Sequence, residues 1–313
     1  RRWKYHDGVP ILIPSMHTPL LMLATAATLP VTGPTGVRRL HITRHGETTW
    51  NAAERLQGTL DESTLTPLGE RQAAELGRRL AAEEAGAIES VVCSPLGRAR
   101  QTHAIVHAHY VAHGAAAPLP APAVNTDLRE IDLREWEGRL KHELATGADA
   151  RAWRVWKQRP SDFAFADGFA PLRELMQRAE RSWRALVAHP PPLPPPPARG
   201  ADKPSDAAGD ERARRGGATL VIAHGGLNRA LLLTALGLPI ERFSEPRFAF
   251  ENCAWAEVEV RPGEGPDGVR WRWRHPGPAG EWRTARSEQE EAERQHRAGR
   301  PLAQRAEPPS ATF

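Results

Sequence analysis

The chain has 313 residues, with 42 lysines and arginines, 38 aspartates and glutamates, and a formal net charge of +4. A hydrophobic share of 40% can form a core, whereas 29 prolines and 26 glycines predict that part of the chain is not packed. Because no basic stripe with interleaved aromatic side chains occurs, we do not expect a nucleic-acid partner. Two cysteines make no disulfide framework, and we expect both to be reduced and buried.

Residues 1–36 have the composition of an extension outside the packed domain. Arg1, Arg2 and Lys4 stand against one acid, Asp7, and an Ala/Thr/Leu/Pro run follows them. Prolines interrupt this run before it reaches the ~18 apolar residues that a membrane span needs, so we expect no span and no membrane partner. Two interpretations stay open, an ordinary disordered extension and the remnant of an organelle transit peptide.

The segment after this extension alternates strand and helix patterns. A hydroxyl cap followed by proline marks the helix start at Thr66-Pro67, and apolar periodicity supports the other elements. The predicted elements are a strand Val37–Thr43, a helix from Pro67, a strand Ile88–Cys93, a helix from about Leu96 to His113, and two further helices over 141–158 and 171–189.

The second half begins with a proline-rich stretch. Residues 190–217 hold proline runs and then charged and glycine residues, which is typical of a linker-like insertion, partly polyproline II. The predicted elements after it are a strand Ala218–Ala223, a helix Leu227–Leu236, and an edge hairpin formed by 254–260 and 269–274. The organisation is therefore an extension over 1–36, a domain over 37–275, and a charged tail over 276–313 that we expect to be disordered.

Two histidine–glycine pairs follow apolar strands. Arg44-His45-Gly46 comes after the first predicted strand, and His224-Gly225 comes after Ala218–Ala223. Strand ends are where open α/β sheets place their ligands. The arginine beside the first histidine favours an anionic ligand, and phosphate is the obvious candidate.

Further motifs occur in a fixed order around these pairs. They are Glu47-Thr48-Thr49-Trp50-Asn51, the segment from Cys93-Ser94-Pro95 to Arg98, Asp127–Asp132, and Trp136-Glu137-Gly138. In type and order they resemble the histidine phosphatase superfamily, which is phosphoglycerate-mutase-like, over residues 37 to about 260. The resemblance implies an α/β fold, a three-layer α/β/α sandwich whose mostly parallel sheet carries an antiparallel edge.

The resemblance also implies roles for six residues and no metal or other cofactor. His45 would attack phosphorus to form a phosphohistidine. Glu130 would protonate the leaving oxygen and later activate water. The residues expected to hold the phosphoryl group of a small phosphorylated substrate are Arg44, Asn51, Arg98 and His224.

Several segments resemble the plant and algal 2-carboxy-D-arabinitol-1-phosphatase group in particular. They are Asp127–Leu133, Asp167-Gly168, Leu172–Leu175, Ala188-His189 and Leu236–Leu238. This narrower resemblance implies a sugar-acid phosphate as substrate and the chloroplast stroma as location, with the cytoplasm as the alternative. The oligomeric state is left open.

Two other functions are weighed against a phosphatase. A phosphoglycerate mutase is disfavoured because the segment after Glu130 resembles the phosphatase branch and the mutases' substrate-clamping insertion is not evident. A non-catalytic phospho-ligand binding or regulatory protein is disfavoured because His45, Arg98, Glu130 and His224 are all present. One departure keeps this alternative open and bears on the choice of substrate, Gly168-Phe169-Ala170, where many phosphatases of this family carry Gly-Glu-Ser. His103 and His107 have the i, i+4 spacing of metal ligands, but no acidic partner lies within that turn, so we expect a solvated or half-buried helix face and no metal.

Overall fold

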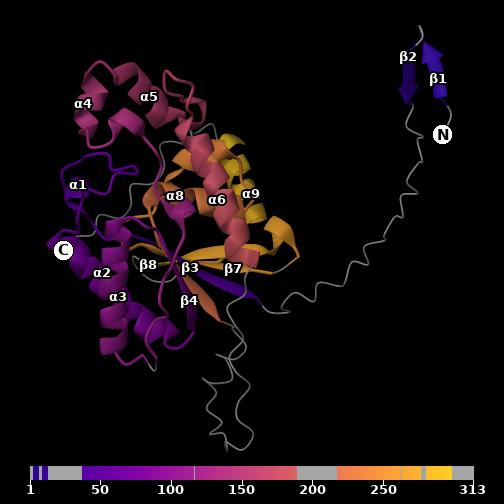
Figure 1. Cartoon of the computed structure of the whole chain (residues 1–313). Helices are drawn as coiled ribbons and strands as arrows, with labels where there is room; N and C mark the ends of the chain where they lie inside the picture. The colour runs from indigo at the N-terminus through magenta and orange to yellow at the C-terminus, as the bar shows by residue number, and fades with distance from the viewer. Residues whose placement is uncertain are drawn as a thin grey trace, which may run out of the picture. The chain divides into compact units, whose positions relative to one another are not determined.

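The computed structural model describes residues 3–6, 9–12, 37–115, 117–188, 217–261, 263–275 and 280–297. The chain divides into two units, Arg1–Gly33 and Pro34–Phe313. In the first unit β1 (Trp3–His6) pairs with β2 (Val9–Leu12) in an antiparallel register, so a hairpin replaces the disorder expected for this stretch (Figure 1). The rest of the expected extension and the insertion up to residue 216 lie outside the described residues.

The second unit is built on a seven-stranded sheet in the order β5-β4-β6-β3-β7-β8-β9. The first four of these strands run parallel, whereas β7, β8 and β9 add antiparallel pairs, as predicted. The strands are β3 (Arg38–Arg44), β4 (Ile88–Cys93), β5 (Ala123–Val124), β6 (Ala218–Ala223), β7 (Trp255–Val260), β8 (Val269–His275) and β9 (Arg283–Thr284).

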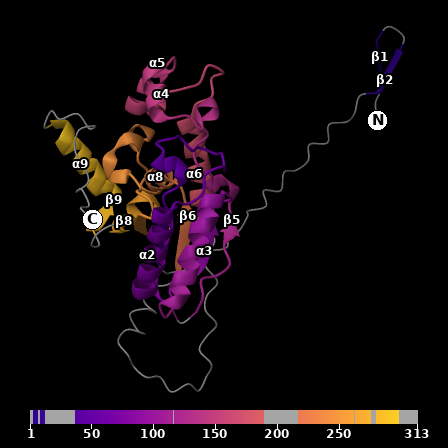
Figure 2. The same cartoon turned by 90° about the vertical axis from the view of Figure 1, so that its left-hand side faces the viewer.

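Helices cover both faces of this sheet, which confirms the three-layer prediction (Figures 1 and 2). The pair α2 and α3 packs on one face, and the pair α6 and α8 packs on the other. The helices are α1 (Thr49–Ala52), α2 (Pro67–Glu84), α3 (Gly97–Ala112), α4 (Lys141–Thr146), α5 (Ala150–Gln158), α6 (Pro171–Ala188), α8 (Gly225–Ala235) and α9 (Ala285–Arg297). Short 3-10 turns lie at Thr126–Leu128 (η1), Arg134–Trp136 (η2), Pro160–Asp162 (η3), Ile240–Ser244 (η4), Pro246–Phe248 (η5) and Gly265–Gly268 (η6).

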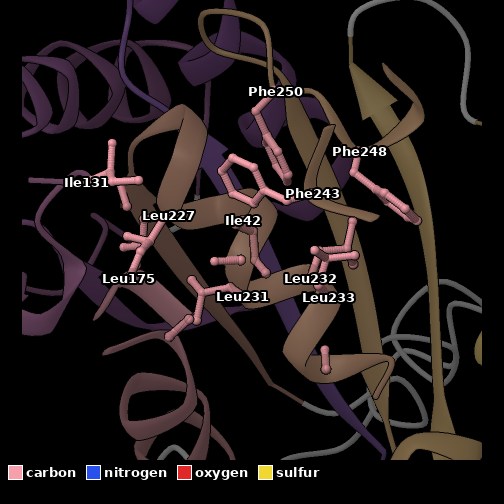
Figure 3. Close-up of a cluster of buried hydrophobic side chains, with 14 of the residues drawn as sticks. Ile42, Ile131, Leu175, Leu227, Leu231, Leu232, Leu233, Phe243, Phe248 and Phe250 are labelled. Carbon is pink, nitrogen blue, oxygen red and sulfur yellow. The ribbon is translucent and has the colours of Figure 1, made fainter. Parts of the chain in front are cut away.

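The period-2 alternation of β3 assigns its side chains to the two layers. Leu40 and Ile42 enter the core on the α6–α8 face, where Figure 3 shows Ile42 among Leu175 of α6 and Leu231 of α8. β6 is buried at all six positions because helices cover both of its faces. The core therefore fixes the ends of the central strands rigidly.

α2 begins where the capping threonine and the proline of the sequence predict a helix start. The Thr66 hydroxyl accepts a hydrogen bond from the Gly69 amide at 3.0 Å, and Pro67 occupies the first helical position. Both predicted features satisfy or remove backbone donors that the first turn leaves unpaired. Cys93 and Cys253 are unpaired and buried, as expected, and burial raises the pKa of each thiol to about 12.

The single helix predicted over 141–158 is wrong, because the structure has two helices there. α4 ends at Gly147, whose extended backbone (φ −89°, ψ −161°) breaks the helical path before α5 begins. α4, α5, η3 and the loop that leads to α6 form a segment over residues 140–170, which we call the cap. Its aromatic side chains pack on Trp136, with the Trp153, Phe163 and Phe165 rings 4.8–5.8 Å away.

The disorder predicted for the tail is also wrong over the residues that form β9 and α9. Glu288 of α9 is 0% exposed, because Arg242, Arg247 and Arg283 pair with its carboxylate. The charged composition of the tail therefore predicted disorder, whereas the structure has a buried ion-pair site there. Residues 298–313 lie outside the described part. None of the described helices combines the length and apolar composition needed to cross a bilayer.

Candidate active site

Three neighbouring parallel strands end at the same level. Because Arg44 of β3 pairs with Ala223 of β6, the residues that follow them, His45 and His224, lie side by side with ring centroids 5.2 Å apart. Ser94 follows β4, the strand on the other side of β6. The predicted meeting of the two histidines is therefore present, and strands spaced about 4.8 Å apart make it compact.

The His45 ring is held in one orientation. Its Nδ1 lies 2.7 Å from the Gly46 carbonyl oxygen, and since a carbonyl only accepts, Nδ1 carries the proton. The lone pair is then on Nε2. Burial foremost, and then the charges of Arg44 and Arg98, hold the pKa of His45 well below its usual 6.5. A neutral imidazole with a free Nε2 is the form that can act as a nucleophile.

Gly46 brings the backbone close to the start of α2. A Cβ at this position would lie 2.4 Å from the Gly69 carbonyl oxygen, so any other residue would displace the strand end. The Gly46 amide donates to the Thr102 hydroxyl at 3.0 Å, which ties the turn to α3. The glycine of the Arg-His-Gly motif thus has a steric cause.

The ring of His224 is held through one of its two nitrogens. Its Nε2 lies 2.7 Å from the Ser94 hydroxyl, which itself accepts from the Leu96 amide at 3.3 Å. Because a hydroxyl can donate once and accept twice, this contact is compatible with either neutral tautomer of the ring. Nδ1 is buried and finds no partner in the described part of the chain. Burial, then Arg98 and His45, keep the pKa of His224 well below 6.5.

Ser94 was not singled out by sequence reasoning. The signal was available, because Ser94 takes the same place after β4 that His45 and His224 take after their strands. Its partner is 130 positions away, so only the order of strands in the sheet reveals the contact.

Two arginines add positive charge. Arg98, at 0% exposure, donates from Nη1 to the Leu60 carbonyl at 2.8 Å and from Nη2 to the Gly58 carbonyl at 2.7 Å. Arg44 donates from Nη1 to the Phe250 carbonyl at 3.1 Å. In both, Nε is buried and has no partner among the described residues, and burial lowers the guanidinium pKa. Unpaired buried donors cost about 1–3 kcal/mol each, so these groups fit an anionic ligand.

Glu137 fixes the loop whose carbonyls accept hydrogen bonds from Arg98. This carboxylate accepts from the amides of Thr59 at 2.8 Å and Leu60 at 2.9 Å, and also from Leu133 at 2.9 Å. One side chain thus joins the loop that supports Arg98 to the loop that follows Glu130. The sequence motif contained Glu137, but its supporting role depends on the fold.

Glu130 lies at the first turn of α8. Its Oε2 accepts from the Gly226 amide at 3.0 Å, and its Oε1 accepts from the Leu227 amide at 3.1 Å and from Ile131 at 2.9 Å. The adjacent glycines at the start of α8 face the two groups, because a Cβ at Gly225 would lie 3.3 Å from Arg44 Nε and one at Gly226 would lie 2.6 Å from Glu130 Oε1. The predicted acid therefore belongs to the same cluster of groups.

Asn51, the remaining residue predicted to bind phosphate, is connected to His45 through hydrogen bonds. Its Oδ1 accepts from the Thr48 amide at 3.3 Å and from Asn252 Nδ2 at 3.3 Å, and Asn252 also donates to the His45 carbonyl at 3.0 Å. Asn252, which sequence reasoning missed, therefore links Asn51 to the His45 backbone. The amide nitrogen of Asn51 remains the donor for the phosphate contact, which stays a prediction.

Among the described residues, one group of side chains has ligand atoms close enough for a metal ion. His41, Glu84 and Glu257 place theirs within 4.8 Å of one another. Arg39, however, donates to Glu84 at 2.7 Å and to Glu257 at 2.8 Å, so a guanidinium already neutralises this cluster. The rings of His103 and His107 are 6.0 Å apart, and within the described ranges they have no third metal-ligating neighbour.

The fold and these groups define a class of site. Two imidazoles, two buried guanidinium groups and one carboxylate lie near the carboxyl ends of parallel strands, an arrangement that suits a tetrahedral oxyanion. The family described as the histidine phosphatase superfamily (branch 1) matches residues 40–192 and 205–274. The chain belongs to this superfamily.

Named relatives agree with this assignment. A wheat (Triticum aestivum) 2-carboxy-D-arabinitol-1-phosphatase is 33% identical over 73% of this chain, which spans only 38% of that relative's length. A probable phosphoglycerate mutase of Klebsiella pneumoniae is 32% identical over 71% of this chain and 85% of its own. The solved structure of a mycobacterial glucosyl-3-phosphoglycerate phosphatase, 26% identical, matches 77% of this chain and 99% of that chain with a TM-score of 0.55.

Proposed function

We propose that the chain hydrolyses a small phosphorylated sugar or sugar acid through a phosphohistidine on His45, without a metal. The observation that carries the proposal is a set of buried nitrogen atoms that have no partner among the described residues and belong to the side chains around His45. These atoms are Nε of Arg44, Nε of Arg98 and Nδ1 of His224, which would carry the ring proton. They would stabilise the charge spread over the equatorial oxygens of the transferring phosphoryl group.

The first step transfers the phosphoryl group to the protein. The bond between His45 Nε2 and phosphorus forms while the bond from phosphorus to the ester oxygen breaks, and Glu130 gives its proton to that oxygen. In the second step Glu130 takes a proton from water, whose oxygen attacks phosphorus. The Nε2–phosphorus bond then breaks, inorganic phosphate leaves, and His45 returns to its neutral form.

The substrate that the named relatives favour is 2-carboxy-D-arabinitol 1-phosphate, with the chloroplast stroma as location and the cytoplasm as alternative. The wheat relative carries this substrate in its name, and the mycobacterial structure is named for another sugar-acid phosphate. The chain corresponds to 38% of the wheat protein, so the substrate assignment is part of the proposal. Turnover of generic sugar phosphates with none of this compound would contradict it.

A phosphoglycerate mutase is the second candidate, because the Klebsiella relative bears that name. A mutase returns the phosphoryl group from His45 to a second hydroxyl, whereas a phosphatase passes it to water. Incubation with labelled 2- and 3-phosphoglycerate separates the two activities. Dominant transfer between the phosphoglycerates, with little release of phosphate, would reverse the ranking.

The direct test is a panel of phosphate esters assayed in EDTA. The wild type should release phosphate, and His45→Ala should not. His107→Ala, which changes a half-buried histidine on α3, should retain activity. Rapid quenching should also trap an acid-labile phosphoryl group on the wild type. Strict metal dependence, or equal turnover by His45→Ala, would reject the mechanism, and phosphate-ester binding without turnover would favour the non-catalytic interpretation.

A further inference from the structure

Arg178 of α6 makes an unusual set of contacts for a helix arginine. It is 4% exposed, and its Nε donates to Glu174 at 2.6 Å. Its Nη1 donates to the backbone carbonyls of Asp127 at 3.1 Å and Arg129 at 2.5 Å, and its Nη2 donates to the carbonyl of Glu130 at 3.0 Å. One planar guanidinium thus binds three carbonyls of the segment that carries Glu130.

These carbonyls lie where the short turn η1 ends. Backbone acceptors at the end of a turn have no partner within it, so they need one from elsewhere. Arginine offers five donors in a fixed fork and no acceptor, whereas lysine offers one charged centre on a flexible stem. The fork of Arg178 therefore fixes both the position and the direction of the peptide units up to Glu130.

The other end of Glu130 is fixed by a different helix. Its carboxylate accepts from the Gly226 and Leu227 amides of α8. α6 and α8 pack against each other, and Figure 3 shows Leu175, three residues before Arg178, in the cluster that also holds Leu227 and Leu231. Hence the backbone of Glu130 is held by α6 and its carboxylate by α8, across one rigid interface.

We propose that Arg178 is a positioning residue for the acid–base step, which sets the reach of the Glu130 carboxyl group to the leaving oxygen. The proposal rests on the proposed function, since it assigns Glu130 the role of acid. Four of the five Arg178 N–H donors bind Glu174 and the three carbonyls, so we assign it a role that acts through the Glu130 backbone.

The same helix supplies a matched control. Arg181 also reaches this segment, but it binds the Asp127 side chain at 2.8–3.0 Å, and its own side chain is 55% exposed. An exposed ion pair contributes little to stability, and this one leaves the Glu130 backbone untouched. Arg181→Gln therefore removes a neighbouring arginine without removing the carbonyl contacts.

The experiment compares two phosphate esters that differ in their need for an acid. The leaving group of 2,4-dinitrophenyl phosphate departs without protonation, whereas the alkoxide of glycerol 2-phosphate requires it. kcat/KM is measured for both esters with the wild type, Arg178→Met, Arg178→Lys, Glu130→Gln, the Arg178→Met/Glu130→Gln double variant and Arg181→Gln. Thermal melting shows which variants are folded, and Arg178→Lys keeps the charge if Arg178→Met fails to fold.

A positioning role predicts a leaving-group-dependent loss. For glycerol 2-phosphate, Arg178→Met should lose about 100-fold in kcat/KM, which lies within the range of general acid catalysis, and Arg178→Lys about 10-fold. For the dinitrophenyl ester both should stay within about threefold, as should Glu130→Gln. The double variant should lose no more than Glu130→Gln alone, because the two residues act as one unit.

Three results would overturn the proposal. They are an equal loss on both esters in the folded Arg178 variants, full additivity in the double variant, and a loss in Arg181→Gln as large as in Arg178→Met. A wild type that hydrolyses neither ester would instead reject the proposed function. The two failures are therefore distinguishable by the wild-type activity alone.

Discussion

The buried ion cluster around Glu257 yields a prediction about stability. Glu257 is 1% exposed, and its Oε1 accepts from Arg39 while its Oε2 accepts from Arg272 and Arg274, at 2.8–3.2 Å. Glu257→Gln keeps the shape but removes the negative charge that three guanidinium groups contact. Breaking a buried pair on one side costs about 3–5 kcal/mol of unfolding free energy. For a domain of this size, that lowers the melting temperature by roughly 6–20 °C.

The neighbouring Glu259 serves as the control. It lies two residues further on the same strand and pairs with Arg270, whose side chain is 44% exposed. Glu259→Gln should cost less than about 1 kcal/mol, because exposed ion pairs contribute little. Urea unfolding followed by circular dichroism measures both variants. Equal losses for the two would refute the idea that burial of the charges decides the cost.

The same cluster predicts a dependence on pH. Burial opposes ionisation, but the surrounding positive side chains outweigh it and lower the pKa of Glu84 and of Glu257 from 4.5 to about 2. A carboxylate with a depressed folded-state pKa stabilises the fold fully above its unfolded pKa, and that contribution is lost as the pH falls. Unfolding free energy should therefore drop between pH 4.5 and 2, and Glu257→Gln should drop less. Parallel slopes would contradict the linkage.

Three further predictions concern the site. Ser94→Ala removes the partner of His224 Nε2. Since a buried hydrogen bond is worth about 1–3 kcal/mol, kcat/KM should fall about 10-fold or more in a steady-state assay. An unchanged kcat/KM would show that the contact has no functional role. Gly226→Ala would place a Cβ 2.6 Å from Glu130 Oε1, so the same assay should show at least a 10-fold loss with an unchanged melting temperature. Because burial and arginine charge depress the pKa of His45, ¹⁵N NMR should show a neutral ring at pH 6.5, and an imidazolium signal there would count against a ready nucleophile.

The sequence predicted the parts of the site that local patterns encode. His45 and His224 each follow an apolar strand, and parallel strand ends meet at one sheet edge, so their proximity followed from local pattern and fold class together. Arg44 was indicated by its place beside His45, whereas Glu130 and Arg98 came from the family resemblance.

Other contacts depend on tertiary register and had no local signal. Ser94 meets His224 only because β4 lies beside β6, and Glu137 supports Arg98 only because two loops meet. The helix break at Gly147 was missed because one glycine is a weak breaker in a helical pattern. α9 was missed because its charges suggested solvent, whereas the partners of Glu288 come from distant turns.

The cap is separate in the chain from the residues proposed for the reaction. The side chains to which we assign bond making, charge compensation and proton transfer come from the strand ends, from α1, from α3 and from the segment before η2, and none of them is drawn from residues 140–170. Replacing the sequence between Arg139 and Pro171 should therefore leave those side chains in place, provided that the replacement keeps aromatic side chains packed on Trp136.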